Sequence, residues 1–256
     1  VLYDFWNTTA RLPGGDYASS VSTEWGPLEP KALQPGGARR FGPEISFGRT
    51  VADASPGTRV AILKASGQGT TILEHWERGL PPDARYPEKS QLYHTLFGSL
   101  DSATYPTLAY PSEPTRLDAA LSRLEARGDT YQIAGFIWLQ GENEAAWSAA
   151  FTYEEHLRSF VDAVREDLAS PQLPFVIARL SLNGSASEGG PLPDAGVLAV
   201  RDAQASLAAT DEHVALVDID DLPPETPGGF HFTTEGYITR GARIGEAYLA
   251  LGRGAG

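Results

Sequence analysis

The chain has 256 residues, 41% of them hydrophobic, which is enough for one sizeable α/β core or, as the less favoured alternative, two small domains. Its formal net charge of −13 argues against nucleic acid or an anionic membrane as a partner, because both require clustered Lys and Arg. The absence of Cys excludes disulfides, thiolate metal sites and a cysteine nucleophile. No apolar run reaches the roughly 18 residues needed to span a bilayer. We therefore expect a single domain over residues 1–256, with no membrane or nucleic-acid partner.

Strand and helix patterns alternate along the chain. Short apolar runs rich in β-branched residues, hydrophobic almost without interruption, predict strands buried on both faces of a parallel sheet. In chain order the expected elements are a helix at 43–53, a strand at 59–65, a helix at 117–128, a strand at 133–139, a helix at 157–168, a strand at 173–180, a helix at 194–209, a strand at 214–219 and a helix at 233–251. This alternation predicts a three-layer α/β fold. The Pro- and Gly-rich stretches 12–40, 81–114 and 183–193 are long connections, which are typical of functional loops.

Two polar clusters directly follow predicted strands, where ligands bind in open α/β sheets. The first, at residues 66–71, holds Gly69, whose backbone N–H could serve an oxyanion hole; an ordinary strand-to-helix turn explains it equally well. The second, at residues 140–144, offers the amide of Gln140 and the carboxylate of Glu142. A solvated helix N-terminus is the competing interpretation of the second cluster.

A third cluster contains His231, which lies between two aromatic residues after the last predicted strand. Histidine suits a general base because its pKa lies near the working pH. We assign structural roles to the other four histidines: His75, His94, His156 and His213. The nearby Asp218, Asp220 and Asp221 lack the spacing of a Ca²⁺ loop, so we expect a solvated acidic loop rather than a cation site.

Together these segments resemble the sialate O-acetylesterase and acetylxylan esterase branch of the SGNH hydrolases (carbohydrate esterase family 6-like). The resemblance rests on four ordered blocks: FGPEISFGRTVAD at 41–53, KASGQGTTILEHW at 64–76, GFIWLQGENEA at 135–145 and HFTTEGYITRGARIGEAY at 231–248. It implies a flavodoxin-like sheet of five parallel strands and an acyl-enzyme mechanism. By the same resemblance His231 is the catalytic base, Gly69 and Gln140 are oxyanion donors, and Glu142 is a candidate for orienting His231.

The family's nucleophile is missing from the printed chain. In the family the serine lies in a GQSN block after the first, central strand, and no GQSN, GDS or G-x-S-x-G occurs here. Ser66 and the serines of the Gly-rich loop at 184–187 lack the motif. Residues 1–5 are too short to replace the central strand. We therefore expect roughly 20–40 residues upstream of Val1 to carry the strand and the nucleophile.

The family's acid is also missing from its usual place. Many SGNH enzymes have Asp three residues before the catalytic His, where this chain has Gly228. The triad could use Glu142 instead, or the protein could work as a Ser–His dyad.

We thus expect a serine esterase that removes O-acetyl groups from an acetylxylan or sialate-type carbohydrate, without a metal or organic cofactor. The alternatives are a catalytically impaired pseudoenzyme or carbohydrate-binding module on the same fold and, less favoured, an esterase for lipid or aryl esters. A polymeric substrate would place the protein outside the cell or in the periplasm. Aromatic residues in the long loops could stack on sugars or pack as satellite core: Trp6, Trp25, Tyr86, Tyr93 and Tyr110.

Overall fold

The structure is a computed structural model that describes residues 1–11, 17–21, 24–32, 39–67, 69–78, 92–98 and 115–253. The chain divides into two compact units. One comprises Val1–Arg40 and Arg59–Gln132, and the other comprises Phe41–Thr58 and Ile133–Gly256. Over the described ranges, no helix is both long and apolar enough to cross a membrane.

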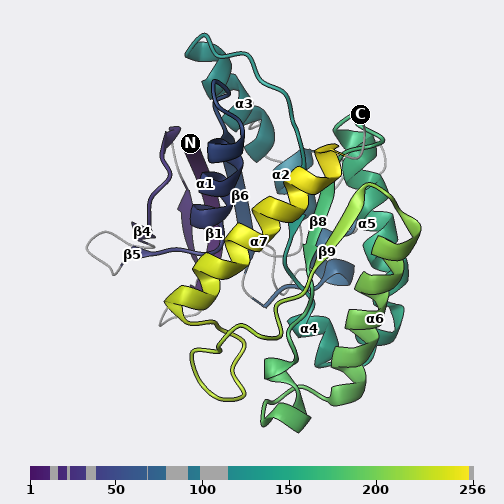
Figure 1. Cartoon of the computed structure of the whole chain (residues 1–256). Helices are drawn as coiled ribbons and strands as arrows, with labels where there is room; N and C mark the ends of the chain where they lie inside the picture. The colour runs from purple at the N-terminus through teal and green to yellow at the C-terminus, as the bar shows by residue number, and fades with distance from the viewer. Residues whose placement is uncertain are drawn as a thin grey trace. The chain divides into compact units, whose positions relative to one another are not determined.

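The first unit is built on a parallel strand pair (Figure 1). Strand β1 (Leu2–Arg11) runs parallel to β6 (Ala61–Gly67). Strands β2 (Tyr17–Val21) and β3 (Gly26–Pro27) pair with β1 in the antiparallel direction. The described parts of the stretch 12–40, expected to be a connection, thus contain strands. The unit also has the short strands β4 (Lys31–Ala32) and β5 (Arg39–Arg40), a π-helical turn η1 (Ile72–Trp76), and helices α2 (Leu92–Phe97) and α3 (Arg116–Ala126).

Residues 2–5 begin strand β1, which the apolar pattern does not predict and which tertiary contacts hold in place. That this segment cannot replace a central strand stays a prediction. Asp4, on β1, is 2% exposed and forms an ion pair with Arg123 of α3. The indole Nε1 of Trp25 donates a hydrogen bond to the Ala120 carbonyl oxygen at 2.7 Å. Partners this far along the chain are not visible in a local hydrophobic pattern.

The second unit contains a parallel three-stranded sheet in the order β7-β8-β9. Its strands are β7 (Phe136–Trp138), β8 (Phe175–Ala178) and β9 (Val214–Val217). Every residue of the central strand β8 is buried. This burial on both faces explains the uninterrupted apolar run that predicts the strand.

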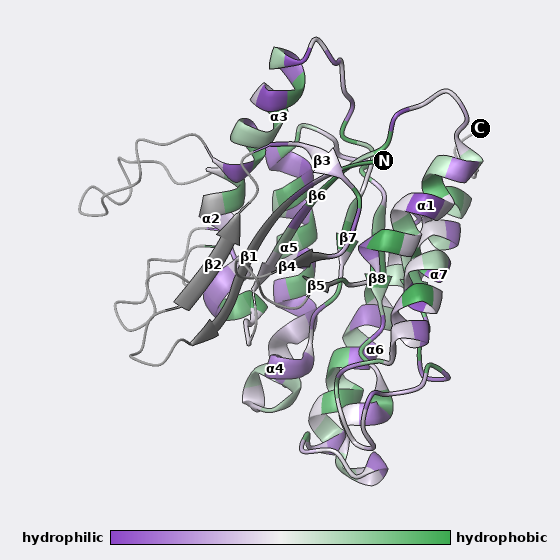
Figure 2. Cartoon of the chain, turned by 90° about the vertical axis from the view of Figure 1, so that its left-hand side faces the viewer, coloured by the Kyte–Doolittle hydropathy of each residue, from purple (hydrophilic) through white to green (hydrophobic). Residues whose placement is uncertain are grey.

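Helices cover both faces of this sheet (Figure 1). Val176 and Ala178 of β8 share a core cluster with Ile244 of α7 (Thr234–Arg253), while Phe175 packs edge-to-face against Phe160 of α5 (Tyr153–Asp167) on the other face. Figure 2 shows hydrophobic and hydrophilic residues sharing the surface of each helix, as expected where one stripe faces a core. The other elements of this unit are α1 (Glu44–Ala54), α4 (Glu142–Ala145), α6 (Asp194–Thr210), and the short 3₁₀ helices η2 (Ser148–Thr152), η3 (Leu182–Gly184) and η4 (Ala186–Glu188).

Helices α1 and α7 pack closely because α7 carries small residues at their contact. A Cβ on Gly241 would lie 2.0 Å from the Pro43 carbonyl oxygen, and one on Gly245 would lie 2.8 Å from Thr50 Cβ. The FGPE and closing-helix blocks of the sequence therefore meet directly in the fold. Their glycines are fixed by this close approach rather than by backbone conformation.

All four predicted strands and all five predicted helices are confirmed, with ends displaced by a few residues. The described parallel strands belong to two hydrogen-bonded sheets, β1 with β6 and β7 with β8 and β9. The mixed α/β class is therefore confirmed, and the single five-stranded sheet stays a prediction.

Candidate active site

The Gln-Gly-Glu segment follows β7 and needs glycine at its centre. Gly141 has φ +144°, and a Cβ there would lie 2.7 Å from Val200 Cγ1. Any side chain would thus combine an unfavourable backbone conformation with a collision against α6. This constraint places Gln140 at the carboxyl end of β7 and Glu142 at the start of α4.

The Gln140 side chain is fixed by buried partners. Its Nε2 donates a hydrogen bond to Glu144, which is 1% exposed, and its Oε1 lies 3.1 Å from the Tyr153 hydroxyl. Burial, reinforced by the charge of Glu144, raises the pKa of Tyr153, so this hydroxyl stays protonated and donates. Nε2 carries two hydrogens, and Glu144 takes one of them. Glu144 therefore orients the amide predicted to be an oxyanion donor, a role that spacing alone does not reveal.

Gln204 of α6 joins the ends of two strands. Its side chain is fully buried; Nε2 donates to the Gln140 carbonyl oxygen at 3.1 Å, and Oε1 accepts from the Leu180 N–H at 2.8 Å. Both bonds satisfy main-chain groups that the strand ladder leaves unpaired. Gln204 thereby sets the spacing between the segments that follow β7 and β8.

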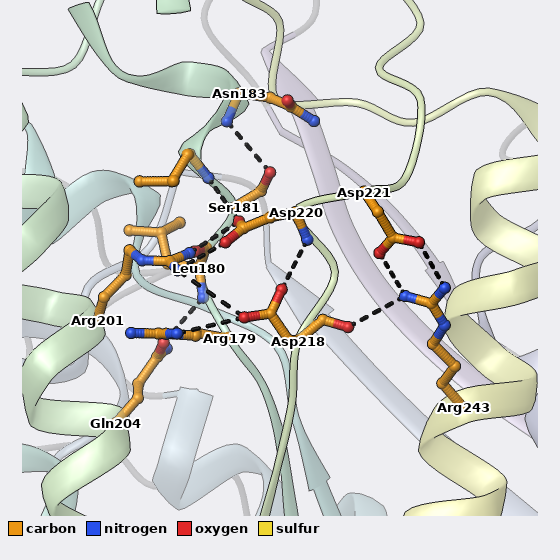
Figure 3. A network of polar contacts seen from close by, with 11 residues as sticks. Arg179, Leu180, Ser181, Asn183, Arg201, Gln204, Asp218, Asp220, Asp221 and Arg243 are labelled. Carbon is orange, nitrogen blue, oxygen red and sulfur yellow. Dashed lines mark hydrogen bonds and ion pairs between the residues drawn. The ribbon is translucent and has the colours of Figure 1, made fainter. Parts of the chain in front are cut away.

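The three aspartates after β9 pair with arginines (Figure 3), while Asp218 and Asp221 keep exposed side chains, as expected of a solvated acidic loop. Asp220 receives two hydrogen bonds from Arg201 of α6, at 2.8 and 2.7 Å. Asp221 receives two from Arg243 of α7, both 2.6 Å. The remaining pair joins Asp218 to Arg179, at 3.2 Å. The negative charges of these aspartates are therefore balanced by arginines of the same unit.

These arginine pairs connect elements that are far apart in the sequence. Arg201, 5% exposed, also donates to the Leu180 carbonyl oxygen at 2.5 Å, so one guanidinium binds the segments after β8 and β9 together. Asp220 in turn accepts from the Leu182 N–H at 3.1 Å. The result is a frame at the carboxyl edge of the sheet, in which charge-assisted hydrogen bonds join the loops to α6 and α7.

His231 lies in the loop between β9 and α7, and its ring is exposed. Its Nδ1 is 3.3 Å from the hydroxyl of Tyr237, one turn into α7. In the described part of the chain, no hydrogen bond or ion pair joins His231 to Glu142 or to a serine. The structure thus brings His231 to Tyr237, a partner that sequence reasoning missed although the two residues lie six positions apart.

Gly228 has no room for the acid that the family usually has at this place. Its φ is +71°, and a Cβ would lie 2.5 Å from the Gly189 carbonyl oxygen. An aspartate here would require the two loops to separate. The close packing of this loop against Gly189 is therefore incompatible with an aspartate at position 228.

A small pocket brings together two of the predicted residues of this unit, Gln140 and Glu142, while His231 is not part of its lining. It is lined by Gln140 and Glu142, by the aromatic neighbours of His231, and by arginine. Its volume is about 10 Å³, roughly the space for one water molecule. The full lining is Gln140, Glu142, Ala178, Arg179, Leu180, Ser181, Gly184, Ile219, Phe230, Phe232 and Arg240.

Gly69, the other predicted oxyanion donor, belongs to the first unit and is exposed, with φ +63°. The neighbouring turn is fixed by side chains: Thr70 Oγ1 accepts from Trp76 Nε1 at 3.1 Å, and His75 Nδ1 accepts from the Thr71 N–H at 3.0 Å. The structural role predicted for His75 is confirmed. The role of Gly69 stays a prediction, and Gln68 lies outside the described residues.

Comparison with protein families identifies the chain. The sequence profile of the carbohydrate esterases described as sialic acid-specific acetylesterases matches residues 20–250. The chain belongs to this family. No curated protein sequence matches the chain at a significant level.

Solved structures similar to this acetylesterase-family chain show the same fold. A protein from Arabidopsis thaliana is 22% identical, with 96% of this chain and 80% of that chain covered and a TM-score of 0.57. A carbohydrate acetylesterase from Xanthomonas citri is 19% identical over 98% of this chain, with a TM-score of 0.59. The match covers 49% of the Xanthomonas protein, so this chain spans about half its length. NanS is 13% identical, with coverages of 98% and 88% and a TM-score of 0.56.

The aromatic residues of this acetylesterase-family chain are distributed differently from the expectation. Trp25 and Tyr93 are 7% and 0% exposed, so the packing interpretation is confirmed for both. The Trp6 side chain, Tyr86 and Tyr110 lie outside what the structure describes. Trp147 and Phe151, beyond the Gln-Gly-Glu segment, are instead 69% and 68% exposed. They present the large apolar surfaces that the long loops were expected to supply.

Proposed function

We propose that the chain is a serine esterase that removes O-acetyl groups from a carbohydrate of the acetylxylan or sialate type. The observation that supports this proposal is the pocket lined by Gln140, Glu142 and the phenylalanines on either side of His231. Membership in a family of carbohydrate esterases supports the same reaction class. For a protein acting on such a substrate, we propose an extracellular or periplasmic location.

The proposed mechanism forms an acyl-enzyme. A serine hydroxyl, for which we nominate none of the described residues, attacks the acetyl carbonyl carbon while His231 takes its proton. Collapse of the tetrahedral intermediate breaks the bond to the sugar oxygen, which receives that proton from His231. Water, deprotonated by His231, then attacks the acyl carbon and releases acetate and the free serine. Gln140 and Gly69 are the proposed donors to the oxyanion.

Tyr237 is the group proposed to orient His231 in place of the missing acid. Burial is the largest effect on the pKa of Tyr237 and raises it, so the hydroxyl is neutral at working pH. To act as a base through Nε2, His231 must carry its proton on Nδ1. In this tautomer Nδ1 donates a hydrogen bond to the Tyr237 hydroxyl oxygen, 3.3 Å away. Glu142 acts in this scheme through its charge in the pocket rather than through a hydrogen bond to His231.

Other proposed features follow from the family resemblance and the exposed surface. The two units form one SGNH domain with a five-stranded sheet, and no cofactor takes part. The exposed rings of Trp147 and Phe151 provide surfaces on which a sugar ring can stack. The competing function is carbohydrate binding without turnover, which the blocked acid position at Gly228 favours.

Acetate release by the full-length gene product from acetylated xylan or a chromogenic acetate ester tests the proposal. His231→Ala should lower kcat about 10²–10⁴-fold, the usual contribution of a general base, with folding intact. The matched control is His213→Ala, a partly exposed histidine just before β9. Turnover at the parent rate in His231→Ala would remove His231 as the base. Sugar binding without acetate release would establish the binding module instead.

A further inference from the structure

Arg240 of α7 is a buried cation that has no hydrogen-bond or ion-pair partner among the described residues. Its side chain is 9% exposed, and its Nε has no hydrogen-bond acceptor. Among the described residues, no hydrogen bond or ion pair reaches either of its terminal nitrogens. The group it contacts is the face of the Phe232 ring, 5.3 Å from the guanidinium carbon.

The other buried arginines of this unit show what Arg240 lacks. Arg165 forms two hydrogen bonds with the carboxylate of Asp211, and Arg201 forms two with that of Asp220. A guanidinium only donates, and a buried donor without an acceptor is costly. The protein thus satisfies two of its three buried arginines in this unit and leaves Arg240 with its donors unused.

The pocket beside Arg240 defines what can satisfy it. Arg179, Arg240 and Glu142 line it, and Asp218 pairs with Arg179, so these four charges sum to zero. Arg179 thus has a carboxylate partner although its Nε lacks an acceptor, whereas no described residue accepts from Arg240, and its unused donors are what an anion would gain here. The charge of Glu142 acts on Arg240 from a distance without a hydrogen bond.

We propose that Arg240 is the cation of a carboxylate-binding site. The space of about 10 Å³ admits one oxygen-sized group and excludes a ring. A carboxylate can enter it with one oxygen, which accepts a charge-assisted hydrogen bond from the guanidinium of Arg240. The ligand is either acetate, the product of the reaction, or the carboxylate of an acidic sugar. This choice of acids rests on the proposed function.

Calorimetric titration of the full-length protein with sodium acetate and with sodium glucuronate tests the site, with glucose as the uncharged control. We expect one or both carboxylates to bind and glucose to show no Arg240-dependent binding. Arg240→Gln should weaken carboxylate binding about tenfold or more, because it removes a charge-assisted hydrogen bond. Tighter binding of acetate identifies a product site, and tighter binding of glucuronate identifies a subsite for acidic sugars.

The control is Arg243→Gln, three residues along the same helix, where the arginine is already paired with Asp221. It should bind carboxylates like the parent. Arg240→Lys, checked for folding by circular dichroism, keeps the charge and loses the fork, so its affinity should fall between parent and Arg240→Gln. The proposal is overturned if neither carboxylate binds, or if Arg240→Gln and Arg240→Lys both bind as the parent does.

Binding and turnover separate this proposal from the proposed function. Carboxylate binding that depends on Arg240, in a protein that releases no acetate, supports the site and refutes the esterase. Acetate release without carboxylate binding supports the esterase and refutes the site.

Discussion

Gln204→Ala should destabilise the protein more than any neighbouring change on α6. The substitution removes two buried hydrogen bonds, of 2.8 Å from the Leu180 N–H and 3.1 Å to the Gln140 carbonyl oxygen. The Leu180 N–H is left unsatisfied at a cost of about 1–3 kcal/mol, while the Gln140 carbonyl oxygen keeps a hydrogen bond from the Tyr153 hydroxyl and loses about 0.5–1.5 kcal/mol. The free energy of unfolding should therefore fall by about 1.5–4.5 kcal/mol, a large part of the roughly 5–15 kcal/mol typical of a folded protein.

Urea denaturation followed by circular dichroism measures this loss, and Asp202→Ala is the matched control. Asp202 is exposed on the same helix, so its replacement should change stability by about 0.5 kcal/mol or less. Gln204→Ala should also lower kcat, because Gln140 and Leu180 both line the pocket. A Gln204→Ala protein within about 0.5 kcal/mol of the parent would refute the view that this side chain joins the two strand ends.

Three further predictions concern the site and its frame. Tyr237→Phe should lower kcat at neutral pH by about tenfold while leaving KM nearly unchanged, since it removes the oxygen that fixes the His231 ring; an unchanged pH–rate profile would exclude this role. Glu142→Gln should slow acetate release if its charge assists the base, and parental kinetics would leave Glu142 without a catalytic part. Burial acts to raise the pKa of Asp211, but hydrogen bonds, above all the one from Arg165, act more strongly in the other direction. The pKa of Asp211 is therefore lowered. Because the folded-state pKa lies below the ordinary 3.8, the stability from Asp211 is present above pH 3.8 and lost as pH falls below it. Urea midpoints measured from pH 6 to pH 2 should fall less steeply in Asp211→Asn, and equal slopes would contradict the assignment.

The elements of the second unit could be predicted because their signals are local. The strand at 173–180 is an unbroken apolar run, and the helix at 157–168 repeats its apolar residues every three or four positions. Each pattern arises from contact with the core and needs no knowledge of the partner. Strand β1 could not be predicted in this way, since it is held by an ion pair from Arg123 to Asp4, 119 positions away.

The candidate site was predictable in its residue types and not in their connections. Gln140, Glu142 and His231 follow strand ends, which is the usual place for a site in an α/β sheet. Which groups orient them depends on side-chain direction, so Tyr237 and Glu144 could be assigned only from the structure. Nothing in the sequence indicated that Arg240 is buried, because an arginine on a closing helix is normally expected at the surface.

A ligand that binds the guanidinium of Arg240 can also be found by measuring the thermal stability of the protein. A molecule that binds only the folded protein raises the free energy of unfolding by mass action, by about 2.7 kcal/mol at one hundred times its Kd, and so raises the melting temperature. A library of organic acids can thus be ranked by melting temperature, without an assay for the reaction. The natural ligand would be recognised by the upward shift that it produces in the parent and fails to produce in Arg240→Gln.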